Sequence, residues 1–135
     1  AQHAEPAATK LVITPLNANI LREKENLSEG IGKIDPYCVV TLGSDAQKTQ
    51  PHENGGKTPS WNNPLNFNWK GENSAKVELM EKNSLMKDEF LGEGQLTLPA
   101  GSNLKKGPQT QEIKLTNNKA DAGSINIQFE FFQKQ

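Results

Sequence analysis

The sequence predicts an all-β fold, an eight-stranded antiparallel β-sandwich with Greek-key connections. Apolar and polar residues alternate with a period of two in short runs, most clearly at Ile125, Ile127, Phe129 and Phe131. Clusters of Gly, Asn and Ser separate these runs, as expected for turns. Apolar residues make up only 33% of the chain, which favours strands that show one face to water over strands buried on both faces.

The first four runs lie in the first half of the chain. Residues 11–15 carry apolar side chains on one parity and end in a proline, which suits a sheet edge because it cannot donate to a ladder. Residues 35–42 are rich in β-branched and aromatic side chains, and a further short strand is expected at 46–49. In 65–69, apolar residues alternate with two asparagines.

The second four runs follow the same pattern at residues 77–80, 96–98, 113–115 and 125–131. Turn signals punctuate the series of eight, at 43–45, 54–56, 71–73, 100–102 and 117–118. A weaker alternative is a short helix over residues 19–28, inserted in a loop.

Length and charge narrow the class of protein. We expect one domain at residues 9–135 after a flexible tail at residues 1–8, and a monomer. The net charge of -1 argues against nucleic acid as a partner. A lone Cys38 excludes an internal disulfide framework and suits a reducing compartment. With no apolar run near the roughly 20 residues of a membrane span, we expect a cytoplasmic protein that is peripheral to membranes.

The residues that usually carry catalysis are not arranged for it. His3 lies in the tail and His52 in a loop, with no Cys or second His at zinc spacing. Cys38 is expected in the core or at its rim, and Trp61 and Trp69 as an anchor and a core residue of the sandwich. The chain is therefore expected not to be an enzyme.

Four segments, found in order, resemble the C2 domain family. They are residues 11–21, the Lys-Ile-Asp-Pro-Tyr-Cys stretch from Lys33, the Lys-Thr-Pro-Ser-Trp-Asn-Asn-Pro-Leu stretch from Lys57, and 77–92 ending in Phe-Leu-Gly. The resemblance covers about residues 10–132, and small stand-alone plant C2 proteins and the C2 domain of Toll-interacting protein are the most similar. It implies a calcium- and phospholipid-binding sandwich.

By this resemblance, calcium would bind where loops converge at one end of the sandwich. The matching positions are Glu29, Asp35, Glu81, Asn83 and Glu89, with Asp88 as an alternative to Glu89. Only Asp35 keeps the family's aspartate, so the resemblance implies weak Ca²⁺ binding at a degenerate site. Two alternatives stay open: Asp35 caps its loop by accepting backbone N–H bonds, and the glutamates are solvated surface residues.

The resemblance also implies two lipid-binding surfaces. One is a loop tip and its surroundings, with these residues in contact with the membrane: Leu85, Met86, Lys87 and Lys33. The alternative is that Leu85 or Met86 packs on Ile31 or Ile34. The other surface is a basic strand face, with these candidates: Lys48, Lys57 and Lys70. Scattered lysines of this kind are also typical of a solvated face.

Two functions follow from these observations. The first is a C2-type module that attaches reversibly to a phospholipid membrane, with weak or degenerate calcium dependence. The second is a calcium-independent scaffold domain that binds a protein partner.

Overall fold

Alternation of buried and exposed side chains along each strand explains why these segments form a sheet. In the segment from Leu65 to Trp69, the three apolar side chains are buried and the two asparagines between them are exposed. The same alternation runs from Ala75 to Leu79. Because successive side chains of a strand point to opposite faces, each segment buries one face and leaves the other to water.

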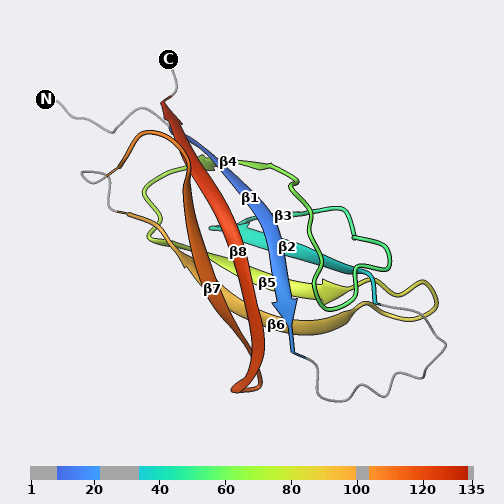
Figure 1. The fold of residues 1–135 in the computed structure, drawn as a ribbon. Coiled ribbons are helices and arrows are strands. Elements are labelled where there is room, and N and C mark those ends of the chain that lie inside the picture. The colour runs from blue at the N-terminus through green and yellow to red at the C-terminus, as the bar shows by residue number, and fades with distance from the viewer. Residues whose placement is uncertain (1–8, 22–33, 100–103, 134–135) are drawn as a thin grey trace, which may run out of the picture.

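A computed structural model describes residues 9–21, 34–99 and 104–133. The tail predicted at residues 1–8 lies outside these ranges. Within them the structure contains eight strands and no helix, which confirms the predicted fold class (Figure 1). The strands are β1 (Thr9–Ile20), β2 (Pro36–Leu42), β3 (Asp45–Lys48), β4 (Leu65–Trp69), β5 (Ser74–Glu81), β6 (Glu89–Thr97), β7 (Gln109–Asn117) and β8 (Ala120–Gln133). Nowhere in these ranges is there a helix that could span a membrane.

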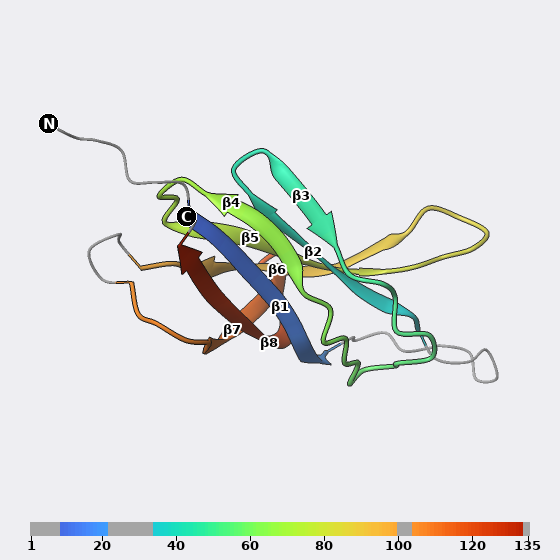
Figure 2. The same cartoon turned by 90° about the horizontal axis from the view of Figure 1, so that it is seen from above.

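The strands pair antiparallel in the order β3-β2-β5-β6-β7-β8-β1-β4. Pairing between β6 and β7 is sparse, with Glu93 opposite Thr116, so the sheet folds over there into two layers (Figure 2). One layer holds β3, β2, β5 and β6, and the other holds β7, β8, β1 and β4. This order makes the Asp-Pro-Tyr segment the start of the second strand.

The core lies between the two layers. Its members with no exposed surface include Leu11, Ile13, Cys38, Val40, Val77, Leu79, Leu96, Leu115, Ile125 and Ile127. Cys38 and Trp69 are buried in it, as predicted, and Trp61 packs against it half-buried. At about 1.5–3 kcal/mol for a fully buried aliphatic side chain, this cluster is the main stabilising term of the fold.

Residues with positive φ allow the tight turn and the close strand pairing of β8. Asn118 and Lys119, with φ of 55° and 72°, form the two-residue loop between β7 and β8, where a type I′ turn requires positive φ at both positions. Gly123 pairs with Ile20 at a φ of 116°. A Cβ there would lie 2.0 Å from the Asn19 carbonyl oxygen, so only glycine fits.

The alternative of a helix at residues 19–28 is wrong for its first two residues. Strand β1 continues through Ile20, whose N–H donates to the Lys57 carbonyl at 2.8 Å while Gly123 pairs with it from β8. Partners on both sides hold the backbone extended. Residues 22–28 lie outside the described residues.

Candidate functional site

Strand register brings three loops to one end of the sandwich. Glu81, at the end of β5, pairs with Pro36 on one side and with Glu89 on the other. The Lys82 N–H donates to the Asp35 carbonyl oxygen at 3.0 Å. The segment before β2 and the β5–β6 loop, residues 82–88, therefore meet at this end, which we call the loop end (Figures 1 and 2).

The third element of the loop end is the connection between β3 and β4, residues 49–64. It runs along β1 beyond the end of β4, with the Trp61 N–H donating to the Leu16 carbonyl at 2.9 Å. The Trp61 indole N–H donates to the Pro36 carbonyl at 3.0 Å, which anchors the connection on β2. These bonds bring His52, Asn54 and their neighbours close to Asp35.

Asp35 caps a turn of this connection. Its Oδ1 accepts the N–H of Asn54 at 2.8 Å, and the Gly56 N–H donates to the Ile34 carbonyl at 3.1 Å. Asn54 has a φ of 58°, a left-handed conformation that asparagine tolerates better than most residues. Asp35 therefore accepts a backbone N–H, as a cap does, although that N–H belongs to the 49–64 connection and not to the loop of Asp35 itself.

Asp88 organises the β5–β6 loop. Its Oδ2 accepts the Tyr37 hydroxyl at 2.5 Å, and its Oδ1 accepts the Asn83 N–H at 3.0 Å. These two bonds and the charges of Lys82 and Lys48 hold the pKa of the Asp88 carboxyl below its usual value, against a smaller opposing effect of desolvation. Burial, then the bond to Asp88 and its charge, raises the pKa of Tyr37 to about 12.

Tyr37 was not among the sequence-predicted site residues. Its partner lies 51 positions away, and no spacing along the chain indicates that contact. The side chain lies on the outer face of β2, beneath the Lys48 ammonium, which sits 5.6 Å from the ring centroid. The phenol thus links a sheet face to the β5–β6 loop.

The expected calcium ligands are gathered only in part. Asp35, Glu81, Asn83 and Glu89 lie at the loop end, whereas Glu29 lies outside the described residues. Among residues 9–21, 34–99 and 104–133, no three His, Cys, Asp or Glu side chains form a group that could hold a metal ion. Calcium takes six to eight oxygen ligands, so these residues do not by themselves fit the ion.

The apolar tip of the β5–β6 loop is exposed. Leu85 is 92% exposed and Met86 69% exposed, and Figure 2 shows the loop extending beyond the strand ends. Side chains this exposed are not packed on Ile34, which itself packs against the core, so the alternative of a tip packed on Ile34 is wrong. Lys87 is exposed beside the tip. Ile31 and Lys33 lie outside the described residues.

The three lysines predicted for a basic strand face are not brought together. Lys48 is on β3, over Tyr37. Lys57 lies at the loop end, where its carbonyl accepts the Ile20 N–H. Lys70 follows β4, whose last residue pairs with Thr9 at the other end of β1. The three lysines thus lie on different elements, and Lys57 and Lys70 lie towards opposite ends of β1.

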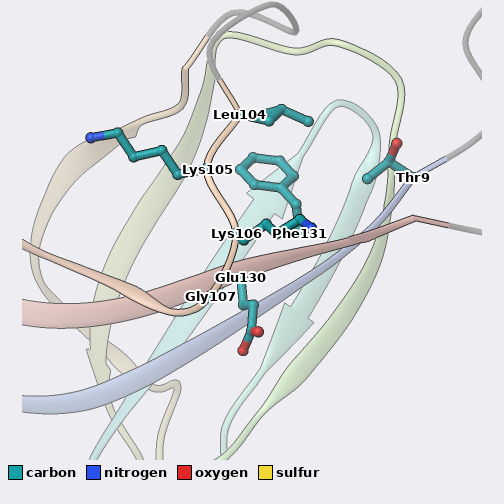
Figure 3. A pocket seen from close by; sticks show the side chains of 7 residues that line it. All are labelled: Thr9, Leu104, Lys105, Lys106, Gly107, Glu130 and Phe131. Carbon is teal, nitrogen blue, oxygen red and sulfur yellow. The ribbon is translucent and has the colours of Figure 1, made fainter.

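The described part of the surface includes two hollows. One, at the end opposite the loop end, has a volume of about 490 Å³, and Figure 3 shows Lys105 directed away from Phe131 on its floor. It is lined by Thr9, Leu104, Lys105, Lys106, Gly107, Glu130 and Phe131. The other, about 790 Å³, lies beside Lys57 and Glu89. Neither shows the convergent polar groups typical of a small-molecule site.

The family model described as the C2 domain matches residues 9–115. The chain belongs to the C2 domain family. C2 domains are binding modules.

Among curated relatives, this C2 domain is similar to Elicitor-responsive protein 1 of Oryza sativa subsp. japonica, 36% identical over 73 residues, which cover 50% of the chain and 46% of the relative. It is 29% identical over 103 residues to Ingression protein fic1 of Schizosaccharomyces pombe, covering 75% of the chain and 37% of the relative. The matched regions thus span less than half the length of these relatives. The resemblance to small plant C2 proteins is confirmed.

Solved structures confirm the fold. A C2 domain-containing protein from a putative elicitor-responsive gene superposes with a TM-score of 0.73 at 21% identity, covering 100% of this chain and 96% of that one. A C2 domain of plant Extended Synaptotagmin 1 superposes with a TM-score of 0.77 at 16% identity, covering 98% of this chain and 99% of that one.

Proposed function

We propose that this C2 domain attaches reversibly to phospholipid membranes through the tip of its β5–β6 loop, with weak calcium dependence. The observation that supports this function is the exposure of Leu85 and Met86 at a projecting loop flanked by Lys82 and Lys87. Adjacent apolar side chains at such a tip do not pack in the core of the domain, and their burial in the interfacial layer of a bilayer is favourable.

The energetics fit weak attachment. Full burial of Leu85 and Met86 would contribute about 1.5–3 kcal/mol each, so half-burial of both contributes roughly 1.5–3 kcal/mol in total. Each lysine near an anionic surface adds about 1 kcal/mol. The carboxylates of Glu81, Asp88 and Glu89 at the same end oppose binding to anionic lipid. The sum describes a peripheral protein that exchanges readily with solution, in keeping with a cytoplasmic location.

Calcium strengthens this attachment only modestly in our proposal. An ion held by Asp35, Glu81, Asn83 and Glu89, with Glu29 completing the set, would offset part of the repulsion between these carboxylates and anionic headgroups. Asp35 already holds Asn54, and Asp88 already holds Tyr37 and Asn83. An ion must compete with these bonds, which favours low affinity.

The test is flotation of the full chain with vesicles of phosphatidylcholine, alone or mixed with phosphatidylserine, with and without calcium. Leu85→Ser combined with Met86→Ser should lower the partition coefficient about 10- to 100-fold, since 1.4 kcal/mol corresponds to a factor of ten. Phe132→Ser is the matched control, because Phe132 is 43% exposed and pairs with Lys10, away from the loop end. Equal binding of the tip variant and wild type would remove the tip from the mechanism.

The second candidate is a calcium-independent scaffold that binds a protein partner. The absence of a metal-holding group among the described side chains favours it over a calcium-triggered switch. It predicts no affinity for either vesicle at any calcium concentration. It also predicts that millimolar calcium leaves the amide chemical shifts of residues 34–36 and 81–89 unchanged.

A further inference from the structure

A turn at the loop end carries the sequence Asn54-Gly55-Gly56. Asn54 is exposed and has a φ of 58°, and Gly55 presents no side chain next to its own backbone nitrogen. We propose that Asn54 is a site of spontaneous deamidation, and that the Asp35 carboxylate controls its rate.

The chemistry requires only water. The backbone nitrogen of Gly55 attacks Cγ of Asn54 and loses its proton, while the side-chain amide leaves as ammonia. The new N–C bond closes a succinimide ring. Water then opens the ring at either carbonyl, which gives aspartate or isoaspartate. A side chain on the following residue would hinder the attack, and glycine has none. Asparagine is among the thermally labile residues for this reason.

The structure explains why a glycine must follow Asn54. A Cβ at Gly55 would lie 2.8 Å from Cγ and Nδ1 of His52, closer than the Cβ atoms of real residues come to their neighbours. The His52 ring is held in place because its Nδ1 accepts the Ser60 N–H at 3.0 Å. A bulkier residue that would protect Asn54 is therefore excluded by the packing of the turn.

The same turn restrains the reaction. The Gly55 N–H donates to the His52 carbonyl at 2.9 Å, so the nitrogen is engaged when the turn is closed. The Asn54 N–H donates to Asp35 Oδ1 at 2.8 Å, which holds the turn against the segment before β2. Attack therefore requires that the turn open, and loss of the Asp35 bond should make opening more frequent.

The product changes the loop end. Aspartate at position 54 adds one negative charge to the residue whose N–H is bound by the Asp35 carboxylate. Isoaspartate also inserts a methylene into the backbone, which the closed turn cannot accommodate. The modified chain should therefore elute later on an anion exchanger than the fresh chain.

The experiment is incubation of the full chain at mildly alkaline pH, with samples digested by trypsin and measured by mass spectrometry against a zero-time sample. The 49–57 peptide contains Asn54 as its single asparagine. The 115–119 peptide is the internal control, because Asn118 is also exposed, has a φ of 55° and precedes a lysine. We expect the 49–57 peptide to lose its asparagine amide and split into two chromatographic forms, while 115–119 keeps its amides. Equal or slower loss from 49–57 would overturn the site.

Two variants test whether Asp35 slows the deamidation of Asn54. Asp35→Ala removes the acceptor and should speed the loss of the Asn54 amide, whereas Asp35→Asn keeps an oxygen there and should stay near the wild-type rate. Equal rates in Asp35→Ala and wild type would overturn the role of Asp35. Asn54→Asp supplies the product of the reaction, identifies its chromatographic position and shows by its unfolding curve whether the turn tolerates the new charge.

Discussion

Replacing Asp35 separates its role as a cap from its role toward calcium. Asp35→Ala removes the oxygen that accepts the Asn54 N–H, while Asp35→Asn keeps an amide oxygen at that place and removes the charge. The two substitutions therefore have different consequences for stability, although both remove one carboxylate from the loop end.

The expected loss of stability follows from one hydrogen bond, the one that Asp35 accepts from the Asn54 N–H. A hydrogen bond to a charged acceptor contributes about 1.5–3 kcal/mol when desolvated, and loss of a capping side chain costs about 0.5–2 kcal/mol. Asp35 is half-buried, so solvent weakens its charge and we expect Asp35→Ala to cost about 1–2 kcal/mol. Asp35→Asn should cost less than about 1 kcal/mol, since neutral hydrogen bonds contribute about that much or less.

Equilibrium unfolding in urea measures both effects. With a slope of about 2 kcal/mol/M, the midpoint of Asp35→Ala should fall by roughly 0.5–1 M, and that of Asp35→Asn by less than about 0.5 M. Equal midpoints for Asp35→Ala and wild type would refute the capping argument. Equal and large losses in the two variants would show that charge, not the accepted bond, stabilises the turn.

Calcium titration of the same proteins completes the comparison. If Asp35 is also a ligand, Asp35→Asn should keep most of its stability but lose the calcium-induced shifts of amide resonances at residues 34–36 and 81–89. Unchanged calcium shifts in Asp35→Asn would show that any ion is held by other groups, and Asp35 would then be a cap alone.

Three further outcomes are expected. Gly123→Ala should destabilise the chain by more than the roughly 1–2 kcal/mol of left-handed backbone strain, because its Cβ overlaps the Asn19 carbonyl oxygen; an unchanged urea midpoint would contradict this. Tyr37→Phe should lower stability at neutral pH. The pKa of Asp88 is lowered from 3.8, so the difference in stability between Tyr37→Phe and wild type should shrink as pH falls below about 4. The pKa of Tyr37 is raised from 10.0 to about 12, so this difference should also shrink as pH rises from 10 towards 12. A difference in stability that stays constant with pH would refute the bond. Cys38 is fully buried, and burial and the charge of Glu78 raise its thiol pKa, so a thiol reagent at neutral pH should modify it only after urea unfolding.

Much of the fold could be predicted because the strands follow from the local alternation of apolar and polar residues. The 65–69 run was predicted by parity alone and became β4 with the same bounds, and the predicted 46–49 strand differs from β3 by one residue. The helix alternative failed at Asn19 and Ile20, since partners on β8 and in the 49–64 connection hold that backbone extended. A local pattern carries no information on such partners.

The candidate site was less predictable. Exposure of Leu85 and Met86 was foreseen because they follow the end of a strand with no apolar period to place them inside. The lysines predicted for one strand face were separated by the fold, since their positions depend on where three different connections run. Asp88 was expected only as an alternative ligand, and its bond to Tyr37 was not predicted.

The sequence by itself determined which segments become strands, which face of each is buried, where the turns lie, and membership in the C2 family. The strands, their buried faces and the turns follow from neighbours one to four positions apart. Family membership follows from four segments found in order along the chain. Only the tertiary structure decided the strand order, the meeting of Asp35 with Asn54, and the meeting of Tyr37 with Asp88. Those contacts arise from pairing register between distant strands, and the register is set mainly by burial of the apolar core that the strands share.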